Sequence, residues 1–490
     1  MRARPSALLL LTAVAALAIV PAASAQKMNS RGGPNFNSVR PTPMPPRGGG
    51  DHGGYHGGYR GGFGVFVPGI VVGPGVFVDD GAVYNGPPRT RRQVQQSSPQ
   101  RASNVPPANE RRYVVDEVVI ELPNSATTQQ VDALRRRHGL TPVESQRFEL
   151  SGTTLYRWRI PDRRSVPTVV SALEGNGVVA QPNYLFALQE TSGAPATEGD
   201  AAQYELSKLH LPQAHALAKG DNVLVAVIDS GVDVNSPELA GSIADTFDTL
   251  PAPFAAHKHG TAIAGLIAAH GKLMGAAPNA KILAIRAFNP DNTGAQGTTF
   301  DILKGLDWAA AHHARVINMS FAGPPDPALH RALEAAHKKG IVLIAAAGNA
   351  GAKSPPLYPA ADANVIAVTA TDADDKLFEQ SNRGNYIAVA APGAQIMVAL
   401  PDGGYELSSG TSYSAAEVSG IAALMLQRDG RLTPDKVRRI LETTAKDLGA
   451  KGRDPLFGFG LADAYAAVMA EHPPVASATP AIERVSTGAR

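Results

Sequence analysis

Five short apolar runs, separated by stretches of helical periodicity, constrain the fold of this chain more than any other feature. The runs are NVLVAVID (222–229), AKILAIRAF (280–288), ARVINMSFAG (314–323), GIVLIAAAGN (340–349) and ANVIAVTA (363–370). Helical stretches such as TFDILKGLDWAAAHH (299–313) and DPALHRALEAAHKKG (326–340) lie between several of them. Strands that are apolar on both faces and joined by helices predict a parallel sheet covered by helices on both sides, which is an α/β fold.

A smaller compact unit is expected upstream, over residues 113–188. Strand patterns occupy 113–122, 153–160 and 178–188, and helical patterns occupy 125–140 and 165–177. Ser125 is a candidate cap of the first helix, and Gly139 a stop signal after it. If the stretch 143–150 adds a strand, the order is β-α-β-β-α-β, which is that of a ferredoxin-like α+β unit.

The amino terminus has the pattern of a secretory signal peptide over residues 1–25. Arg2 and Arg4 precede fourteen mostly apolar residues (7–20), and Ala23-Ser24-Ala25 provides small residues for cleavage after Ala25. Fourteen residues are too few to span a bilayer of about 30 Å. We therefore expect secretion, either to a periplasm or out of the cell, and no transmembrane segment.

Three further segments lack the periodicity of a packed fold. Residues 26–112 are rich in Gly, Pro and Arg, with eleven Lys and Arg against four Asp and Glu, and are expected to be disordered. They form either a solvated linker or a basic tether for an anionic cell surface. Residues 189–203 form a polar linker suited to proteolytic cleavage. Residues 471–490 are expected to be a flexible tail.

Composition excludes several kinds of chemistry. The chain of 490 residues has no cysteine, which rules out disulfides, cysteine nucleophiles and thiolate zinc sites. Its formal net charge of +2 is too small to suggest a nucleic acid as partner.

Chemically active side chains occur where the predicted parallel sheet would gather them. Asp229 ends one strand, Asn349 ends another, and His259 and Ser412 each open a helix. Functional residues of open α/β sheets collect beyond the carboxyl ends of the strands. Each residue has a plainer interpretation: an Asx turn, a turn amide, a surface loop residue and a serine N-cap. Together they would provide a carboxylate, an amide donor, an imidazole and a hydroxyl.

With these residues in place, the chain resembles the subtilisin-like serine proteases over residues 204–470. The resemblance rests on four motifs in the family's order: VIDSGVD (227–233), HGTAIAG (259–265), AAGN (346–349) and SGTSYSAAEVSG (409–420). It implies a subtilisin-like parallel sheet flanked by helices on both faces. The segment 113–188, which closes with AQPNYLFAL, is similar to that family's inhibitory propeptide.

The resemblance implies a serine endopeptidase made as an autoprocessed zymogen. Ser412 would be the nucleophile, His259 its general base, and Asp229 the residue that orients the imidazole. Asn349 and the Ser412 backbone N–H would stabilise the oxyanion. The propeptide would assist folding, occupy the cleft and be removed within 189–203.

Polypeptide substrate is expected to lie extended between two strands of the enzyme. By resemblance, the substrate-binding residues are Gly294, Ala295, Ser320, Phe321, Ala322 and Gly323. Many relatives have glycine where Ala322 stands, so its methyl group would narrow the pocket for the residue that precedes the cleaved bond. Residues 413–417 also depart from the family pattern, and Glu417 is expected to bond to the first-turn N–H groups of its helix.

The chemistry requires no cofactor, and the sequence identifies no metal ligand. Structural calcium is common in the family, but no site can be traced, and Asp372, Asp374 and Asp375 are interpreted as a solvated turn. Two alternatives remain open: a degenerate protease fold that serves as a binding scaffold, and a cell-surface attachment protein that acts through residues 26–112.

Overall fold

The computed structural model describes residues 103–189, 191–195, 203–251, 256–291 and 294–470. The chain divides into two units, 1–94 and 95–490, and every described residue belongs to the second. The predicted signal peptide, the tail 471–490 and residues 26–102 therefore lie outside the described residues.

The described amino-terminal part has the expected β-α-β-β-α-β order. Its elements are β1 (Tyr113–Pro123), α1 (Thr128–Arg137), β2 (Thr141–Phe148), β3 (Thr153–Arg159), α2 (Val166–Glu174) and β4 (Val179–Leu188). The strands pair antiparallel in the order β2-β3-β1-β4. Trp158 and Ile160, on one side of β3 and just beyond it, are buried with residues of α2 in a separate core, and Val131 and Leu134 of α1 pack against it.

Two details of this part differ from the sequence prediction. Thr127, not Ser125, caps α1, because its side chain accepts a hydrogen bond from the Gln130 N–H while Gln130 bonds back to the Thr127 N–H. This reciprocal pair satisfies two N–H groups that a lone serine would leave open. Residues 103–112 also pack with this part, since the Asn104 N–H donates to Glu174 at 2.6 Å.

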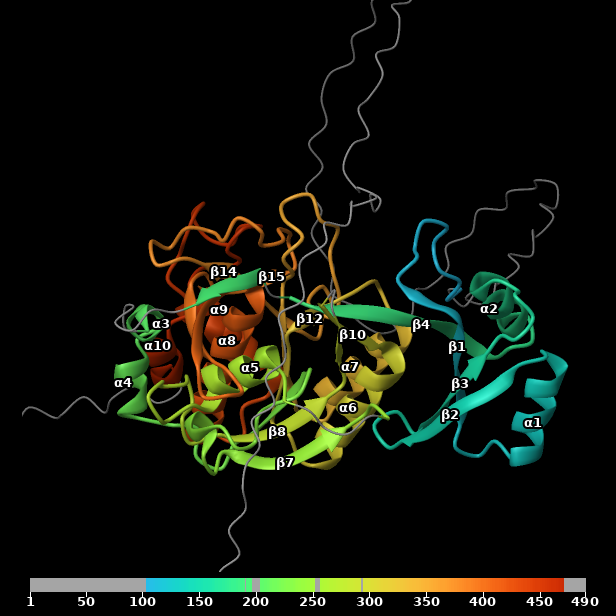
Figure 1. Cartoon of the computed structure of the whole chain (residues 1–490). Helices are drawn as coiled ribbons and strands as arrows, with labels where there is room; N and C mark the ends of the chain where they lie inside the picture. Colours follow the sequence, from blue (N-terminus) through green and yellow to red (C-terminus); the bar gives the residue numbers. More distant parts are fainter. Residues whose placement is uncertain (1–102, 190, 196–202, 252–255, 292–293, 471–490) are drawn as a thin grey trace, which may run out of the picture. The chain divides into compact units, whose positions relative to one another are not determined.

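A parallel sheet forms the centre of the larger part (Figure 1). In spatial order its strands are β15 (Ile387–Pro392), β14 (Ile366–Thr371), β13 (Val342–Ala346), β11 (Val316–Met319), β6 (Leu224–Asp229), β8 (Lys281–Arg286) and β7 (Ile243–Asp248). All neighbours pair in parallel. The prediction of a parallel sheet is confirmed; β7 and β15 were not expected from the sequence.

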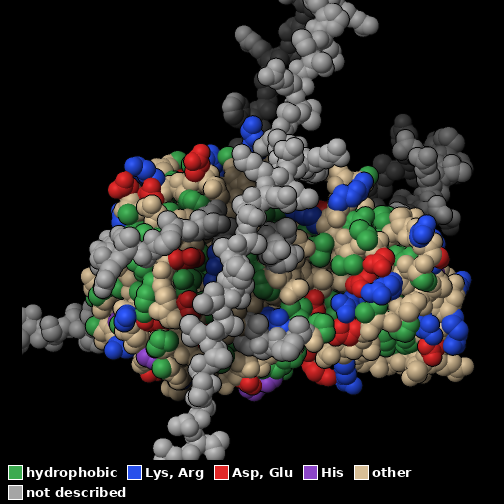
Figure 2. Space-filling model, viewed as in Figure 1, with side chains coloured by type: hydrophobic (Ala, Val, Ile, Leu, Met, Phe, Trp, Pro, Cys, Tyr) green, Lys and Arg blue, Asp and Glu red, His purple; other side chains and the backbone are tan. Residues whose placement is uncertain are grey.

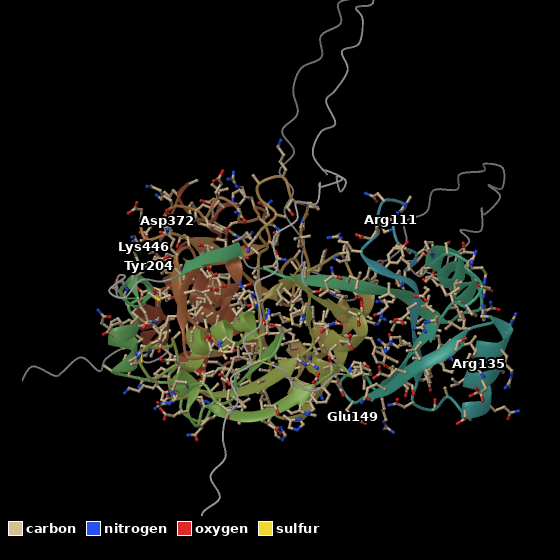
Figure 3. All side chains as sticks on the ribbon, in the orientation of Figure 1. Arg111, Arg135, Glu149, Tyr204, Asp372 and Lys446 are labelled. Carbon is tan, nitrogen blue, oxygen red and sulfur yellow. The ribbon has the colours of Figure 1, made fainter. Side chains whose placement is uncertain are left out.

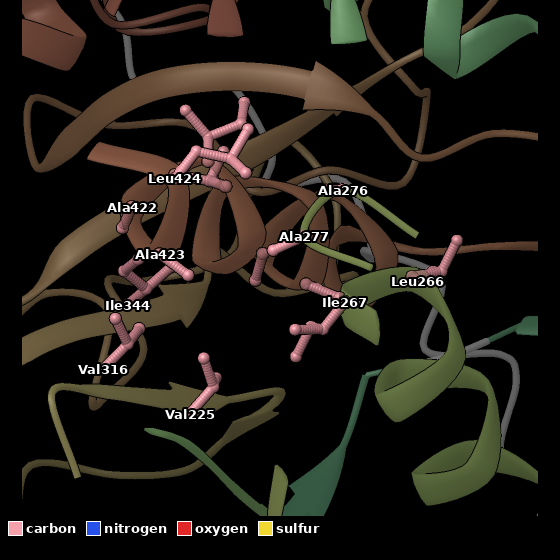
Figure 4. Packing of buried hydrophobic residues seen from close by; sticks show 14 of the residues in the cluster. Val225, Leu266, Ile267, Ala276, Ala277, Val316, Ile344, Ala422, Ala423 and Leu424 are labelled. Carbon is pink, nitrogen blue, oxygen red and sulfur yellow. The ribbon is translucent and has the colours of Figure 1, made fainter. Parts of the chain in front are cut away.

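Helices cover both faces of this sheet because alternate strand residues face opposite sides. Val225, Val316 and Ile344 pack with α5 (Lys258–Ala268) and α8 (Thr411–Arg428) in one core, as Figure 4 shows. The neighbouring residues Ala226 and Ile317 pack with α6 (Thr299–Ala311) and α7 (Pro327–Lys338) in another. Two-sided burial explains why the strands read as continuous apolar runs.

The remaining elements are short. They are β5 (Thr191–Pro195), α3 (Tyr204–Lys208), α4 (Leu211–His215), a 3-10 turn (Pro237–Leu239), β9 (Asn289–Asp291), β10 (Gly294–Thr298), β12 (Phe321–Ala322), β16 (Ile396–Ala399), β17 (Tyr405–Ser409), α9 (Pro434–Thr444) and α10 (Ala464–Met469). Strand β4 continues its sheet into the larger part by pairing with β10 and β12, and β5 pairs with β17. The expected linker 189–203 thus contains a strand.

Candidate active site

Asp229 and His259 form a buried pair. Asp229 ends β6, and His259 is the second residue of α5. The His259 Nδ1–H donates to the Asp229 carboxylate, at 2.8 Å from Oδ1 and 3.0 Å from Oδ2. The N–H and hydroxyl of Ser230 donate to the same Oδ1 at 2.7 and 3.0 Å. These bonds fix the imidazole with its proton on Nδ1, so that Nε2 is the nitrogen able to accept a proton.

A close backbone approach brings these two residues together. Gly231 has a φ of +109°, which favours glycine. A Cβ on Gly260 would lie only 2.3 Å from the Gly231 oxygen. Glycine at both positions therefore lets α5 begin directly against the end of β6, and the sequence motifs contain both glycines for this reason.

Ser412 opens α8 without capping it. The N-cap residue is Gly410, which has no side chain to bond to the helix, so the interpretation of Ser412 as an N-cap is wrong. Ser412 is fully buried, and its hydroxyl lies 2.5 Å from the carbonyl oxygen of Gln189 and 3.2 Å from that of Ser320. At the second position of an 18-residue helix, it lies in the partial positive charge of the helix N-terminus.

Asn349 follows β13 and is held next to the start of α8. Its Oδ1 accepts hydrogen bonds from the Thr411 N–H at 3.1 Å and the Thr411 hydroxyl at 2.8 Å. Its Nδ2 is buried and has no hydrogen-bond partner among the described residues. A buried donor without a partner costs free energy, and one held beside a nucleophile is suited to an anion that forms during a reaction.

The two halves of the site meet where α5 packs against α8 (Figure 1). Tyr413, the neighbour of Ser412, has its ring centroid 6.1 Å from that of His259. The structure thus brings Asp229, His259, Asn349 and Ser412 to the carboxyl end of the parallel sheet. A cavity of about 610 Å³ lies elsewhere, because its lining, which includes Glu121, Val179 and Arg331, contains none of the four.

An extended stretch of the chain itself lies beside Ser412. Strand β4 pairs antiparallel with β12 on one side, Leu188 with Phe321 and Ala187 with Ala322. The Gln189 N–H continues this β12 ladder by donating to the Ser320 oxygen at 3.3 Å. On the other side β4 pairs with β10. Such pairing is how an extended peptide is bound by strand addition.

The other residues expected to bind substrate occupy different positions along this ladder. The β10 residues that pair with β4 are Gln296, Gly297 and Thr298, whereas Gly294 and Ala295 pair with β9. Gly323 lies beyond the β12 pairing, and a Cβ there would be 2.3 Å from the Phe186 ring. The roles of all six residues toward substrate stay predictions.

Sequence reasoning missed Ser230, Thr411 and Gln189. Ser230 and Thr411 lie inside the motifs VIDSGVD and SGTSYSAAEVSG. Their position next to Asp229 and Ser412 was the sequence signal that could have identified them. Gln189 had no local signal, because its contact with Ser412 joins residues 223 positions apart.

The expectation for Glu417 is wrong. Glu417 is buried, and its Oε2 has no hydrogen-bond partner in the described part of the chain. It lies near Glu205 of α3, which is also buried. Burial raises the pKa of Glu205 to about 7, and burial together with the Glu205 charge raises the pKa of Glu417 well above its ordinary value.

The described residues contain no group of three or more His, Cys, Asp or Glu side chains that could hold a metal ion. Asp372 accepts hydrogen bonds from the N–H groups of Asp374 and Lys376 within its own turn. Asp375 pairs with Lys208 at 2.7 Å and with Lys446 at 2.8 Å. Within the described residues, no helix is long and apolar enough to cross a membrane.

Comparisons with known proteins agree with this geometry. The subtilase family matches residues 220–460. A thermophilic serine proteinase of Bacillus sp. (strain AK1) is 33% identical over 383 residues, covering 76% of this chain and 92% of that protein. Thermitase of Thermoactinomyces vulgaris is 37% identical over 275 residues, covering 54% of this chain and 96% of thermitase.

Among solved structures, fervidolysin of Fervidobacterium pennivorans, a keratinolytic enzyme related to subtilisin, matches with a TM-score of 0.62 and 26% identity. The match covers 73% of this chain and 61% of fervidolysin, less than two thirds of it. The chain belongs to the subtilase family. It is a subtilisin-like serine endopeptidase, and its substrates are polypeptides.

Proposed function

We propose that this endopeptidase cleaves peptide bonds through a triad of Asp229, His259 and Ser412. A serine hydroxyl is a weak nucleophile and needs a base. His259 Nε2 would take the Ser412 proton and return it to the leaving amine, while Asp229 keeps the other nitrogen protonated and stabilises the imidazolium. The observation that carries the proposal is the buried Asp229–His259 bond of 2.8 Å beside α8, whose second residue is Ser412.

Asn349 is proposed to stabilise the oxyanion of the tetrahedral intermediate together with the Ser412 N–H. The two Thr411 bonds to Oδ1 fix the orientation of the carboxamide, so Nδ2 is held ready to donate. A donor that is already oriented needs no reorganisation when the negative charge develops.

We further propose that the chain is a secreted zymogen with the expected divisions: signal peptide 1–25, a Gly/Pro/Arg-rich segment 26–112, inhibitory propeptide 113–188, linker 189–203 and peptidase 204–470. The ladder that β4 makes with β10 and β12 supports an inhibitory role, because an extended segment there would exclude substrate. Contact of residues 26–112 with an anionic cell surface stays a prediction.

A fluorophosphonate probe tests the catalytic assignment. The full chain is incubated to allow self-cleavage, labelled, and mapped by peptide mass spectrometry. We expect an adduct on Ser412 in the wild type. His259→Ala is expected to lose the adduct, because the hydroxyl then has no base.

His330→Ala is the matched control, because His330 pairs with Asp362 at the surface of α7, away from Ser412. It should label like the wild type. If the folded full chain neither cleaves itself nor forms an adduct, the triad proposal is wrong and the scaffold alternative takes its place. An adduct on Ser412 that persists in His259→Ala would exclude His259 as the base.

A further inference from the structure

Ser412 lies beside Gln189, which follows the ladder of β4 and precedes that of β5. Upstream, β4 ends at Leu188, and Gln189 adds a hydrogen bond to Ser320. Downstream, β5 begins at Thr191 and pairs with β17, which immediately precedes α8. Both ladders hold the chain extended, and the carbonyl oxygen of Gln189, between them, is 2.5 Å from the Ser412 hydroxyl.

The Gln189 side chain is bound through both ends of its carboxamide. Its Oε1 accepts a hydrogen bond from the Asn349 backbone N–H at 2.9 Å. Its Nε2 donates to the carbonyl oxygens of Ala187 and Leu188 at 3.0 and 3.2 Å. A methionine of similar length would lose all these bonds. A glutamate would keep the bond to Asn349 but would bring its second oxygen against two carbonyl oxygens.

We infer that the first bond this chain cuts in its own maturation is the one that follows Gln189, and that the site accepts glutamine before the cleaved bond through the Asn349 backbone N–H. The inference rests on the proposed function and specifies its substrate. Residues 185–189, Leu-Phe-Ala-Leu-Gln, then represent the sequence that the site prefers in other polypeptides.

The reaction consumes only water. The Ser412 oxygen bonds to the Gln189 carbonyl carbon as its proton passes to His259. The carbon–nitrogen bond then breaks, and His259 gives that proton to the departing amine. Water next attacks the ester, loses a proton to His259, and the Ser412 oxygen leaves and recovers it. The products are a carboxylate at Gln189 and a free amino terminus on the following residue.

The maturation of the full chain tests the position of the cut. Fragments are collected over a time course and their masses measured, with Ser412→Ala as the uncut reference. We expect the earliest amino-terminal fragment to end at Gln189. If its end lies elsewhere while the probe labels Ser412, the inference is wrong and the proposed function stands. If nothing is cut and Ser412 is not labelled, the proposed function itself fails.

Substitution of Gln189 tests the recognition. Gln189→Met should slow the first cut about three- to tenfold, the usual effect of losing a neutral hydrogen bond, and Gln189→Glu should slow it more. Gln146→Met and Gln146→Glu, at an exposed position of β2, should leave the rate unchanged.

The self-cleaved protein is also given the peptide Leu-Phe-Ala-Leu-Gln-Glu-Thr-Ser and two variants that have Met or Glu in place of the Gln. Because the substitutions are then in the peptide, they cannot affect the folding of the protein. We expect cleavage after Gln, with the variants slower in the same order. Equal rates for the three peptides would overturn the assigned role of the Asn349 N–H.

Discussion

At the scale of single residues, the active site depends on which atom of each polar side chain is already occupied. Asn349 uses Oδ1 for Thr411, and Asp229 uses its carboxylate for His259 and Ser230. The Thr411 bonds orient Nδ2 of the amide, and the Asp229 bond sets the proton of the imidazole on Nδ1. The sequence identifies the residue types but does not show which atom of each side chain forms these hydrogen bonds.

Replacing Asn349 with alanine tests the amide. We expect kcat to fall by about 10²–10³, with little change in KM, because the lost donor acts on charge that exists only in the transition state. This range is carried over from subtilisin. Peptide hydrolysis by the self-cleaved protein provides both constants. Asn364→Ala, which removes a side chain bonded to Asp362, is the control. An unchanged kcat would exclude Asn349 from the oxyanion hole.

Ala322→Gly tests whether the methyl group narrows the pocket for the residue before the cleaved bond. Ala322 is almost fully buried beside β4. Its removal should favour peptides with a large residue at that position by about tenfold over small ones, the order of magnitude for one methylene in a pocket. A series of peptides with small and large residues measures the ratio, and an unchanged ratio would contradict the prediction.

At the scale of elements, the start of α5 decides the position of His259. Gly260 packs on the Gly231 carbonyl, whereas Gly265 on the same helix has the Ala399 side chain as its nearest neighbour, at 3.6 Å from an added Cβ. The helix therefore has one glycine that the packing requires and one that it does not.

Gly260→Ala should cost at least 100-fold in kcat/KM, because a Cβ 2.3 Å from the Gly231 oxygen forces the start of α5 to shift, and shifts of about 1 Å in a catalytic group have effects of this size. Gly265→Ala is the matched control and should retain activity, with equal or slightly higher stability. Kinetics and thermal unfolding of both variants are compared. Equal activity of the two would show that α5 can move without harm.

At the scale of the whole molecule, α3 and α8 meet through two buried carboxyl groups. Glu205 accepts a hydrogen bond from Gln203 at 3.0 Å. The hydroxyl of the neighbouring Tyr204 donates to the Ala394 carbonyl oxygen, and Tyr204 lies near Asp372. Figure 3 labels Tyr204, Asp372 and Lys446. The buried cluster joins two acidic groups, whereas acidic and basic side chains are interspersed on the exposed face that Figure 2 shows.

Because Glu205 and Glu417 are buried, the free energy of unfolding is expected to fall as pH rises. The pKa of Glu205 is about 7 in the folded protein and near 4.3 in an unfolded chain, so the unfolded state ionises first. Glu205 should therefore lower the free energy of unfolding by about 4 kcal/mol as pH rises from about 4.5 through 7.

Urea unfolding of Glu205→Gln between pH 5 and 8 measures this effect, with Ser412→Ala in the background to prevent self-cleavage. The variant should lose the part of the slope that Glu205 contributes. Glu334→Gln, an exposed glutamate paired with Lys338, should keep it. A slope that persists in Glu205→Gln would assign the pH dependence to another group.

The sequence alone determined the α/β class and the main strands and identified the four candidate site residues, because two-sided burial and loop-end motifs are local patterns. It missed β7, β17 and β5, whose short and largely polar sequences form strands only by pairing with distant partners. It also missed β15, although the sequence of that strand is apolar. Only the tertiary structure decided that Asp229 meets His259, that Glu417 meets Glu205 and that Gln189 reaches Ser412. These contacts join residues 30 to 223 positions apart, and packing, not local periodicity, sets such distances.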